Sequence, residues 1–369
     1  MKFDKHIVKI IIAGGGTGGH IFPAIAIANA LKAIHPSIEF LFIGANGKME
    51  MEKVPQAGYA IKGLTIAGFN RSHLLKNITL PFKLIKSFWE VKQIFQSFKP
   101  HAVIGVGGYS SFPVLKYAQA KNIPTFIHES NSYAGKSNQF LGKKATKIFV
   151  AVEGMEQFFP KEKLFVSGNP VRKNIVEKTS SSADAKQFFN LQPNKKTILV
   201  IGGSLGAKSI NETIANNIPF FSANNCQLIW QTGKTDAARF KAAANNNSNI
   251  WVNEFIQQMD MAYAAADVVI SRSGAMSVTE LCVAAKPVIF IPFPYAAEDH
   301  QTVNAQYLVN KQAALLVKDS EANQLLMPTL QKLINDDALQ KTLRTNISKH
   351  AVTNADTVIA HEILNNLAL

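Results

Sequence analysis

The chain has 369 residues, more than one ordinary domain holds, which predicts two domains. Apolar residues make up 47% of the sequence and charged residues 17%, so a highly charged disordered chain is excluded. The 39 lysine and arginine residues outnumber the 25 acidic residues and give a net charge of +14. This excess is uneven, because residues 1–172 hold 22 basic and 9 acidic residues and residues 173–369 hold 17 and 16.

Cysteine content and the N-terminus both point to the cytoplasm. Cys226 and Cys282 are too few for a disulfide framework in a chain of this size, which favours two reduced, buried thiols. The first twelve residues include Lys2, Lys5 and Lys9 and lack the apolar core of a signal peptide. No run approaches the ~18 apolar residues that a membrane-spanning helix needs.

The first predicted strand, residues 6–13, is β-branched and apolar, ends at Gly14 and precedes a helical pattern over residues 22–34. This order of strand, glycine turn and helix is typical of a parallel α/β unit. Further short apolar runs, each suited to a strand buried on both faces, occupy residues 38–43, 102–106, 125–128 and 147–150.

A second series begins with residues 197–201, which end in Gly202-Gly203, and continues at residues 227–231, 268–271 and 287–292. The two series predict an α/β fold with two parallel-sheet domains in tandem. We place the boundary at residues 168–172, before a polar stretch. Because parallel sheets bind ligands beyond the carboxyl ends of their strands, two facing domains would put their glycine loops across a shared cleft.

The first glycine loop, Gly14 to His20, fits the pattern G-x-G-x-x-G and suits close approach of the backbone to an anion at a helix N-terminus. A nicotinamide cofactor is disfavoured because the second strand exits through residues 44–46 without an acid to hold a ribose. The loop also lacks the Gly-Lys-Ser/Thr of a triphosphatase. His20 suits a general base near neutral pH, or else an imidazole that caps the helix or lies on the surface.

Two further strand ends of the first half carry polar residues. Residues 105–111 offer backbone N–H groups and hydroxyls to a phosphate or sugar, although a tight turn between strand and helix needs the same glycines. His128, Glu129, Ser130 and Asn131 follow the next strand. Such a polar cluster is awkward in a core, which favours a functional role.

In the second half, residues 202–207 repeat the glycine turn, and residues 271–280 lead from a strand into a helix. The Ser/Gly-rich turn and the helix N-terminus suit a pyrophosphate. Glu280 could accept both hydroxyls of a ribose, or it could simply complement the helix dipole. The polar residues 298–304 open another helix and indicate ligand contacts only weakly.

A helix is predicted from Pro81 to Phe98. One apolar face is interpreted as core and consists of Leu84, Phe88, Val91, Phe95 and Phe98. A second row consists of Phe82, Ile85 and Trp89, flanked by Lys83, Lys86 and Lys92. That row suits contact with an anionic membrane surface, or else it packs beneath another element.

Several motifs occur in order along nearly the whole chain: Gly15-Gly16-Thr17-Gly18-Gly19-His20, Gly107-Gly108-Tyr109, His128-Glu129-x-Asn131, Gly168-Asn169-Pro170-Val171-Arg172, Gly202-Gly203-Ser204-x-Gly206-Ala207, Glu254-Phe255-Ile256, and Arg272-Ser273-Gly274-Ala275 with Glu280. Together they resemble the MurG family of UDP-N-acetylglucosamine-dependent N-acetylglucosaminyltransferases of peptidoglycan synthesis. Each motif alone is common, whereas the set in register is specific.

The resemblance implies a GT-B fold, two Rossmann-like domains facing a cleft. Residues 1–172 would form the acceptor and membrane-associated domain, and residues 173–349 the donor domain. A C-terminal helix within about 350–369, from Asp356 to Leu367, would pack back on the first domain. The family transfers N-acetylglucosamine from UDP to the C4 hydroxyl of undecaprenyl-pyrophosphoryl-N-acetylmuramyl-pentapeptide with inversion, which converts lipid I to lipid II.

Site residues follow from the resemblance. UDP-N-acetylglucosamine would be held by Arg172, Ser204, Ile256, Ala275, Met276, Ser277, Val278, Thr279, Glu280 and Gln301. The Ile256 backbone would read uracil, and Glu280 the ribose. Thr17, Gly18, Gly19 and Asn131 would line the sugar and acceptor side. The chain departs from the family at Ser130 and Leu205, where members usually or often have Gln, and whether His300 or Gln301 contacts the sugar is open, with Gln301 preferred.

An inverting transfer needs one base for the acceptor proton and a stabilised UDP leaving group. His20 is the first candidate for the base and Glu129 the second. The helix N-terminus at residues 275–277, the Ser204 loop and Arg172 would meet the charge of the leaving group. No metal site or cofactor is expected, because the sequence has no histidine or carboxylate cluster with metal-ligand spacing.

The expected partners are UDP-N-acetylglucosamine, the lipid-linked muramyl-pentapeptide and an anionic membrane surface, with a cell-wall synthesis complex as a further partner. These place the protein peripherally on the cytoplasmic face of the bacterial inner membrane. The alternatives are another UDP-sugar enzyme of the same fold, such as an epimerase, and a non-enzymatic basic binding protein. Nucleic acid is disfavoured because no zinc-finger, RRM or helix-turn-helix signature occurs and the lysines alternate with bulky apolar residues.

Overall fold

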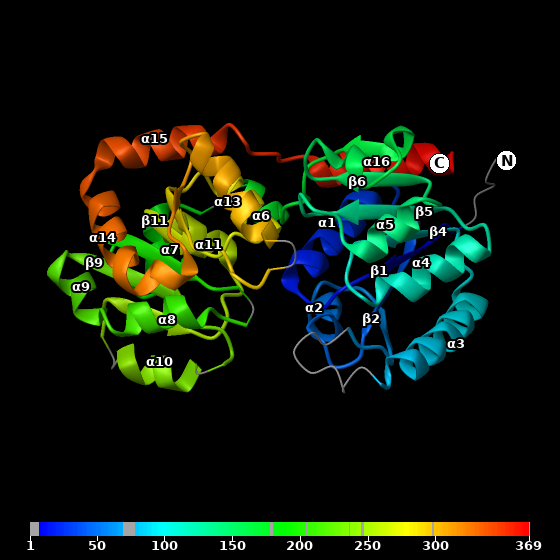
Figure 1. Ribbon diagram of the computed structural model, residues 1–369, viewed down its shortest axis with the longest axis horizontal. Helices are drawn as coiled ribbons and strands as arrows, with labels where there is room; N and C mark the ends of the chain where they lie inside the picture. Colours follow the sequence, from blue (N-terminus) through cyan, green and yellow to red (C-terminus); the bar gives the residue numbers. More distant parts are fainter. Residues whose placement is uncertain are drawn as a thin grey trace. The chain divides into compact units, whose positions relative to one another are not determined.

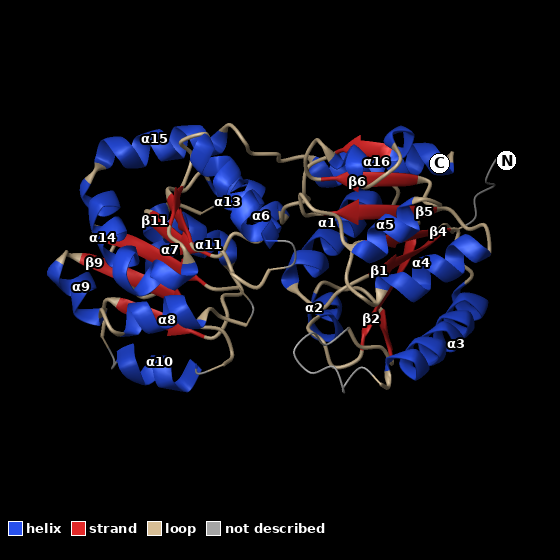
Figure 2. Cartoon of the chain, in the orientation of Figure 1, coloured by secondary structure: helices blue, strands red, loops and turns tan. Residues whose placement is uncertain are grey.

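The protein is described by a computed structural model covering residues 7–68, 78–177, 180–203, 205–235, 237–244, 247–296 and 299–368. The chain forms two compact units: residues 1–172 with residues 354–369, and residues 173–353. Each unit is built on a parallel β-sheet with helices around it (Figure 1, Figure 2). The prediction of an α/β fold with two parallel-sheet domains is confirmed.

The sheet of the first unit has the strand order β3-β2-β1-β4-β5-β6-β7, and all neighbours are parallel. Its strands are β1 (Lys9–Ala13), β2 (Glu39–Ala45), β3 (Ile61–Leu64), β4 (Ala102–Gly105), β5 (Thr125–Glu129), β6 (Lys147–Val150) and β7 (Leu164–Val166). The central strands are buried apolar runs, as a parallel sheet covered on both faces requires.

Two apolar layers cover this sheet. One contains α1 (Gly18–Ile34) and the C-terminal helix α16 (Ala355–Leu367), which lie against each other (Figure 1). Ile359, Ile363 and Leu364 of α16 belong to the same buried cluster as Ile27 and Leu31 of α1. The other layer contains α3 (Leu80–Phe98), α4 (Ser111–Ala120) and α5 (Lys136–Gly142). The unit also holds α2 (Glu50–Gln56), η2 (Met155–Gln157) and η3 (Lys161–Lys163).

The sheet of the second unit has the order β10-β9-β8-β11-β12-β13, again with parallel neighbours. Its strands are β8 (Lys196–Ile201), β9 (Cys226–Gln231), β10 (Ile250–Asn253), β11 (Val268–Ser271), β12 (Val288–Phe290) and β13 (Leu315–Leu316). Its helices are α6 (Lys173–Glu177), α7 (Ser182–Phe188), α8 (Lys208–Ala215), α9 (Ile218–Ala223), α10 (Ala237–Ala244), α11 (Met259–Ala265), α12 (Ala275–Ala284), α13 (His300–Asn310), η5 (Asp319–Glu321), α14 (Ala322–Asn335) and α15 (Asp337–Ser348).

Strand order determines where the loops of each unit gather. The order reverses between β1 and β4 in the first sheet and between β8 and β11 in the second. Loops that leave the carboxyl ends of such strands diverge and open a crevice, which is where α/β proteins bind ligands. The motif-bearing loops 14–20 and 106–111 follow β1 and β4, and loops 202–207 and 272–274 follow β8 and β11.

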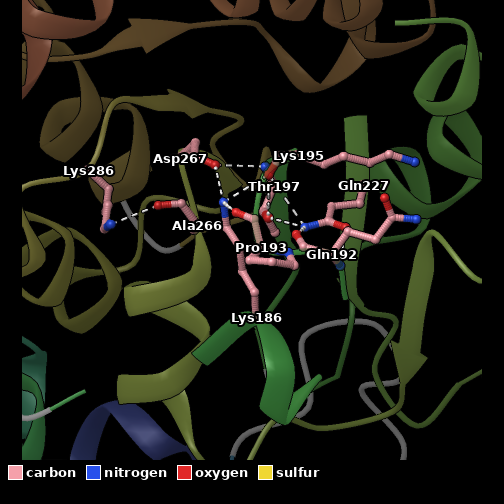
Figure 3. Close-up of polar contacts among 9 residues, drawn as sticks. All are labelled: Lys186, Gln192, Pro193, Lys195, Thr197, Gln227, Ala266, Asp267 and Lys286. Carbon is pink, nitrogen blue, oxygen red and sulfur yellow. Dashed lines mark hydrogen bonds and ion pairs between the residues drawn. The ribbon is translucent and has the colours of Figure 1, made fainter. Parts of the chain in front are cut away.

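A buried lysine fixes the entry to the second sheet (Figure 3). Lys186 Nζ donates to the carbonyl oxygens of Pro193 and Lys195 and to Asp267 Oδ2, at 3.3, 2.8 and 3.2 Å. Asp267 Oδ2 also accepts the Thr197 N–H at 2.8 Å. These contacts join α7 to the turn before β8 and to the start of β11. They lie at the amino ends of the strands, whereas the glycine loops follow the carboxyl ends.

The helix α3 matches its predicted span, but one predicted core residue is wrong. Val91 and Phe95 are buried, together with Ile94, whereas Leu84 is exposed. The buried residues of α3 begin at Ser87, so the first two turns project beyond the packed part of the helix. No helix among the described residues combines the length and apolarity needed to cross a membrane.

Candidate functional site

In the first glycine loop, residues 14–20, the first three N–H groups donate hydrogen bonds to acceptors within the protein. Gly14 N–H donates to the carbonyl of Ile43 at 3.1 Å, and Gly15 N–H to that of Gly107 at 3.3 Å. Gly16 N–H donates to the Glu50 carboxylate at 2.8 Å. A loop whose first three donors are satisfied in this way cannot cradle an anion with them. The expected anion-binding role therefore shifts to the start of α1, at residues 17–19.

Glu50, the first residue of α2, lies beneath this loop with only 1% of its surface exposed. Its Oε1 accepts the Ala45 N–H at 2.9 Å, while Oε2 accepts that of Gly16. A carboxylate therefore does lie at the carboxyl end of β2, although residues 44–46 contain no acid. It accepts hydrogen bonds from backbone N–H groups instead of binding a ribose. Glu50 was not predicted as a site residue, because an acid in the first turn of a helix is usually a surface residue that complements the dipole.

His20 lies in the first turn of α1, and its ring is held on both sides. Nδ1 donates to the carbonyl of Gly15 at 2.9 Å. Gly107 lies against the other nitrogen, since a Cβ there would be 2.8 Å from Nε2. In the neutral ring this hydrogen bond places the proton on Nδ1 and leaves the lone pair on Nε2.

In the loop after β4, residues 106–111, one serine hydroxyl forms a hydrogen bond within the loop itself. Ser110 and Ser111 are buried, and Ser111 Oγ donates to the carbonyl of Gly108 at 2.7 Å. The tight-turn interpretation therefore fits Ser111 better than ligand binding does. Burial and the nearby Glu50 carboxylate raise the pKa of Tyr109, which favours its neutral phenol.

His128 at the end of β5 is fully buried, and among the described residues neither ring nitrogen makes a hydrogen bond of good geometry. Burial lowers the pKa of His128 to about 4, and the charge of nearby His20 lowers it further. Gly168 and Asn169 lie close enough to offset part of this effect. His128 is therefore neutral at physiological pH.

Glu129 is surrounded by donors. Its Oε1 accepts the backbone and side-chain N–H groups of Asn131 at 3.1 and 3.3 Å. Its Oε2 accepts Gly135 N–H at 3.1 Å and Asn138 Nδ2 at 2.8 Å. Glu129 thereby holds the turn after β5 and sets the position of Asn131. Ser130, one of the departures from the family, is buried, and its carbonyl accepts Asn169 Nδ2 at 3.1 Å.

In the second unit, the glycine loop after β8 packs on the loop after β9. Gly206 N–H donates to the carbonyl of Gly203 at 2.9 Å, which also accepts Gln231 Nε2 at 3.0 Å. A Cβ on Gly206 would overlap the backbone of Thr232, so only glycine fits. Leu205 points to solvent. Ser204, a predicted phosphate contact, lies outside the described residues.

The N-terminus of α12 has the properties expected of an anion site. Val278 N–H makes the first intrahelical bond, to the carbonyl of Gly274 at 3.0 Å. The N–H groups of Ala275, Met276 and Ser277 therefore precede the hydrogen-bonded ladder. The first turn contains no acidic residue that would compete for them.

Glu280 is buried one turn further along α12, and Tyr263 of α11 donates its hydroxyl to Glu280 Oε2 at 3.1 Å. This bond orients the carboxylate that was predicted to accept ribose hydroxyls. Tyr263 was not predicted, since an aromatic residue in a helical pattern is usually core. Ile256 is buried in the loop after β10.

Gln301 is positioned by the loops on either side of it. Its Oε1 accepts Phe293 N–H at 3.0 Å, and its carbonyl accepts the Ser273 hydroxyl at 2.8 Å. Asn304, one turn on, donates to the Ser273 carbonyl at 3.1 Å. Gln301 Nε2 lies 3.9 Å from the place where a Cβ of Gly274 would stand. Gln301 therefore adjoins the N-terminus of α12.

Arg272 ties the strand ends of this unit together. Its guanidinium donates to the carbonyls of Ile291 and Pro292, both at 3.0 Å, and pairs with Asp319. It also contacts Ser209 at the start of α8, at 3.2 Å. The loops after β11 and β12 are thus fixed to α8 and η5.

The structure thus brings the predicted residues together in two sets. In the first unit, Thr17, Gly18, Gly19 and His20 stand at the start of α1, where His20 lies against Gly107, and Glu129 and Asn131 lie at the end of β5 and just after it. Arg172 also belongs to this unit, with its guanidinium 4.5 Å from the Phe22 ring. In the second unit, residues 275–280 and Gln301 adjoin each other. No group of three or more potential metal ligands occurs among the described residues.

Comparison with known proteins decides the family. Residues 10–150 match the glycosyltransferase family 28 N-terminal domain, and residues 197–362 match the glycosyltransferase family 28 C-terminal domain. The chain belongs to glycosyltransferase family 28.

Relatives of similar length carry one common name, UDP-N-acetylglucosamine–N-acetylmuramyl-(pentapeptide) pyrophosphoryl-undecaprenol N-acetylglucosamine transferase. The Phocaeicola vulgatus protein is 51% identical over 96% of this chain and 96% of its own length. The Bacteroides thetaiotaomicron protein is 50% identical over 97% of each. Among solved structures, Acinetobacter baumannii MurG is 28% identical, with a TM-score of 0.71 over 97% of this chain and 99% of that chain. The resemblance inferred from the motifs and the GT-B fold it implied are confirmed.

Proposed function

We propose that this protein transfers N-acetylglucosamine from UDP to the C4 hydroxyl of undecaprenyl-pyrophosphoryl-N-acetylmuramyl-pentapeptide in peptidoglycan synthesis. The observation that carries the proposal is the 51% identity, over almost the whole length of both chains, to a protein named for this transfer. The two sets of site residues supply the parts that the reaction needs, a donor site and a proton acceptor. The protein acts as a UDP-N-acetylglucosamine-dependent glycosyltransferase in cell-wall biogenesis, and so in cell shape and division.

The second unit binds the donor. The N–H groups of Ala275, Met276 and Ser277, at the positive end of the α12 dipole, bind the pyrophosphate. Glu280, oriented by Tyr263, accepts hydrogen bonds from the ribose hydroxyls. The Ile256 backbone reads uracil, and Gln301, adjoining Gly274, contacts the sugar. Ser204, Val278 and Thr279 complete the proposed donor set of this unit, and Arg172, which belongs to the first unit, is a further proposed donor contact.

The first unit provides the base. His20 is favoured over Glu129 because its hydrogen bond to Gly15 leaves Nε2 as a proton acceptor, whereas both Glu129 oxygens already accept two donors each. Thr17, Gly18, Gly19 and Asn131 line the acceptor side. Glu129 supports this set by holding Asn131.

The proposed transfer proceeds without a covalent enzyme intermediate. The acceptor oxygen forms a bond to the anomeric carbon as the bond from that carbon to the β-phosphate oxygen breaks. The hydroxyl proton moves to His20 Nε2, and UDP leaves with the electron pair of the broken bond. The donors at the start of α12 stabilise the charge that develops on UDP.

The decisive experiment is incubation of the purified protein with UDP-N-acetylglucosamine and the lipid-linked muramyl-pentapeptide, followed by mass analysis of the lipid fraction. We expect a lipid-linked disaccharide and one UDP for each. Binding of UDP-N-acetylglucosamine without that product, or formation of a free epimerised sugar, would favour another UDP-sugar enzyme instead.

The acceptor is a membrane lipid, and α3 offers a surface that suits it. Phe82, Ile85 and Trp89 are 73, 70 and 59% exposed. Phe82 and Ile85 lie in the first two turns of the helix, before its first buried residue, and Trp89 lies in the next turn, between the buried Ser87 and Val91. Lys83, Lys86 and Lys92 flank them. Apolar side chains ringed by lysines favour an anionic bilayer, each basic residue contributing about 1 kcal/mol near the surface. The protein would bind the cytoplasmic face of the inner membrane peripherally and join a cell-wall synthesis complex there.

Vesicle flotation tests this surface. Phe82→Glu should abolish binding to phosphatidylglycerol vesicles while the unfolding temperature stays unchanged. Leu325→Glu, at an exposed apolar position of the second unit, is the matched control and should bind as the unmodified protein does. Equal binding of the two variants to the vesicles would contradict the proposal that α3 contacts the membrane.

A further inference from the structure

Between the glycine loop and the second strand of the first unit, Glu50 is a buried carboxylate with no role in the transfer just described. Its side chain is 1% exposed, and both oxygens accept backbone N–H groups, from Ala45 at 2.9 Å and Gly16 at 2.8 Å. Burial of a charged carboxylate costs free energy unless hydrogen bonds compensate it. Two charge-assisted bonds to fixed amides provide that compensation.

The space around Glu50 is shaped for this side chain. A Cβ on Gly15 would overlap the carboxylate, and a Cβ on Gly44 would overlap the Cγ and crowd Oε1 at 3.1 Å. Gly15 and Gly16 also have positive φ angles, +151° and +90°, which side-chain-bearing residues rarely adopt. Two glycines, Gly15 in the loop after β1 and Gly44 in β2, thus leave room for one carboxylate.

The loop that Glu50 holds is the one that orients His20. The Gly15 carbonyl accepts the His20 Nδ1–H at 2.9 Å, and the next peptide N–H, that of Gly16, donates to Glu50. The Gly15 carbonyl and the Gly16 N–H belong to the same peptide group. A rotation of that peptide would break both hydrogen bonds together, because the group is planar and its two polar ends point in opposite directions.

We propose that Glu50 is a positioning residue that fixes the Gly15–Gly16 peptide, and through it the tautomer and direction of the His20 ring. The catalytic part of this inference rests on the proposed function, in which His20 Nε2 takes the acceptor proton. With Glu50 in place, the neutral ring carries its proton on Nδ1 and keeps a lone pair on Nε2, on the side of the ring that faces Gly107. Without it, the Gly15 carbonyl no longer selects that tautomer.

Glu50→Gln is the sharpest variant, because it keeps the size of the side chain and one acceptor oxygen. Its NH₂ group would face one of the two backbone N–H groups, donor against donor. Glu52→Gln, at an exposed position of the same helix, is the matched control. We expect Glu50→Gln to lower kcat about 10- to 100-fold, as small misplacements of catalytic groups do, with the Kd for UDP-N-acetylglucosamine within about twofold.

Two readouts separate positioning from a general loss of structure. In ¹⁵N-histidine NMR at alkaline pH, the unmodified protein should show His20 protonated at Nδ1, and Glu50→Gln should show a mixture of tautomers. In a double-mutant cycle, Glu50→Gln should cause almost no further loss of kcat in a His20→Ala background, because both changes act through one group. Glu52→Gln should leave kcat and the spectrum unchanged.

Three results would overturn the inference: a proton on Nε2 in the unmodified protein, an unchanged spectrum and kcat in Glu50→Gln, or losses that multiply in the double variant. Even if Glu50→Gln fails to fold, the spectrum of the unmodified protein tests the inference, because a proton on Nε2 of His20 would contradict it. If the unmodified protein folds and makes no disaccharide lipid, the proposed function fails, whereas the link from Glu50 to His20 is still decided by the tautomer measurement.

Discussion

The two units share a sheet architecture but hold their strand-end loops with opposite charges. In the first unit, buried carboxylates accept backbone N–H groups: Glu50 from Gly16 and Ala45, and Glu129 from Asn131 and Gly135. In the second unit, the buried guanidinium of Arg272 donates to backbone carbonyls after β12. The first unit, with a net charge of +11, therefore anchors its loops with acids, and the second unit, with a net charge of +3, anchors its loops with a base.

This contrast shows that net charge and site electrostatics are separate properties. The lysines of the first unit that flank Phe82, Ile85 and Trp89 lie on α3, on the surface that we propose contacts a membrane. Its buried acids occupy backbone donors that an anion would otherwise use. In the second unit, the buried cation donates to carbonyls, and the N–H groups at the start of α12 are the ones that we propose bind a pyrophosphate.

The largest expected effect is on turnover. His20→Ala should lower kcat about 10²- to 10⁴-fold, the usual contribution of a general base, while the donor Kd stays within about twofold because His20 is not among the residues proposed to hold the donor. His361→Ala, an exposed histidine of the same unit, serves as control. Steady-state kinetics and calorimetric titration with UDP-N-acetylglucosamine separate the two quantities. A similar loss of affinity for UDP-N-acetylglucosamine in His20→Ala would contradict the proposal that His20 acts as the base without holding the donor.

Removal of the buried cation tests the anchoring of the second unit. Arg272→Met should lower the free energy of unfolding by about 3 to 5 kcal/mol, because Asp319 and two carbonyls lose their partner in a buried setting. Arg239→Met breaks the exposed pair with Glu212 and should cost about 1 kcal/mol or less. Urea titration of both variants checks the difference, and equal losses would refute the structural role of Arg272.

His128 makes the stability of the first unit depend on pH. Its pKa is about 4 in the folded chain and about 6.5 when unfolded, so only the unfolded chain takes up a proton between these values. The neutral ring therefore contributes stability that is complete above about pH 6.5 and falls as the pH drops towards 4, by up to about 3 kcal/mol. His128→Leu should remove that part of the pH dependence in urea titrations. An unchanged slope would mean that the folded ring accepts the proton.

The smallest expected effect is on donor affinity. Glu280→Gln should raise the Kd for UDP-N-acetylglucosamine about 10- to 100-fold, since hydrogen bonds to a charged group contribute about 1.5 to 3 kcal/mol. Turnover at saturating donor should change little, because the ribose lies away from the reacting bond. Glu177→Gln, an exposed acid of the same unit, should leave the Kd unchanged. A loss confined to kcat would move Glu280 out of the donor site.

The sequence predicted the interior of both sheets and missed their edges. Every strand predicted from a buried apolar run is present within a few residues, including β6 and β11 at their predicted bounds. The four strands that were not predicted are β3, β7, β10 and β13, which are the edge strands of the two sheets. Edge strands are short and only partly buried, so their sequences lack the continuous apolar run that marks a central strand.

A similar division applies to the site. The sequence proposed the glycine loops, His20 and Glu129 because such residues at or just after strand ends are unusual for a core, and it proposed Glu280 because this acid follows a Ser/Gly-rich turn into a helix. Glu50, Tyr263 and Arg272 acquire their roles only through partners that are 34, 17 and 47 residues away in the sequence. No local pattern distinguishes a glutamate that opens a helix on the surface from one whose carboxylate turns beneath a distant loop.

By itself, the amino-acid sequence determined the fold class and the family and identified the loops in which we propose that the chemistry resides, since each depends on a local run of residues or on motifs in order. The tertiary structure decided which donors and acceptors within those loops are already satisfied. That decision belongs to the fold because a backbone N–H can bind a ligand only if no buried side chain has taken it first, and the Gly16 N–H is taken by Glu50.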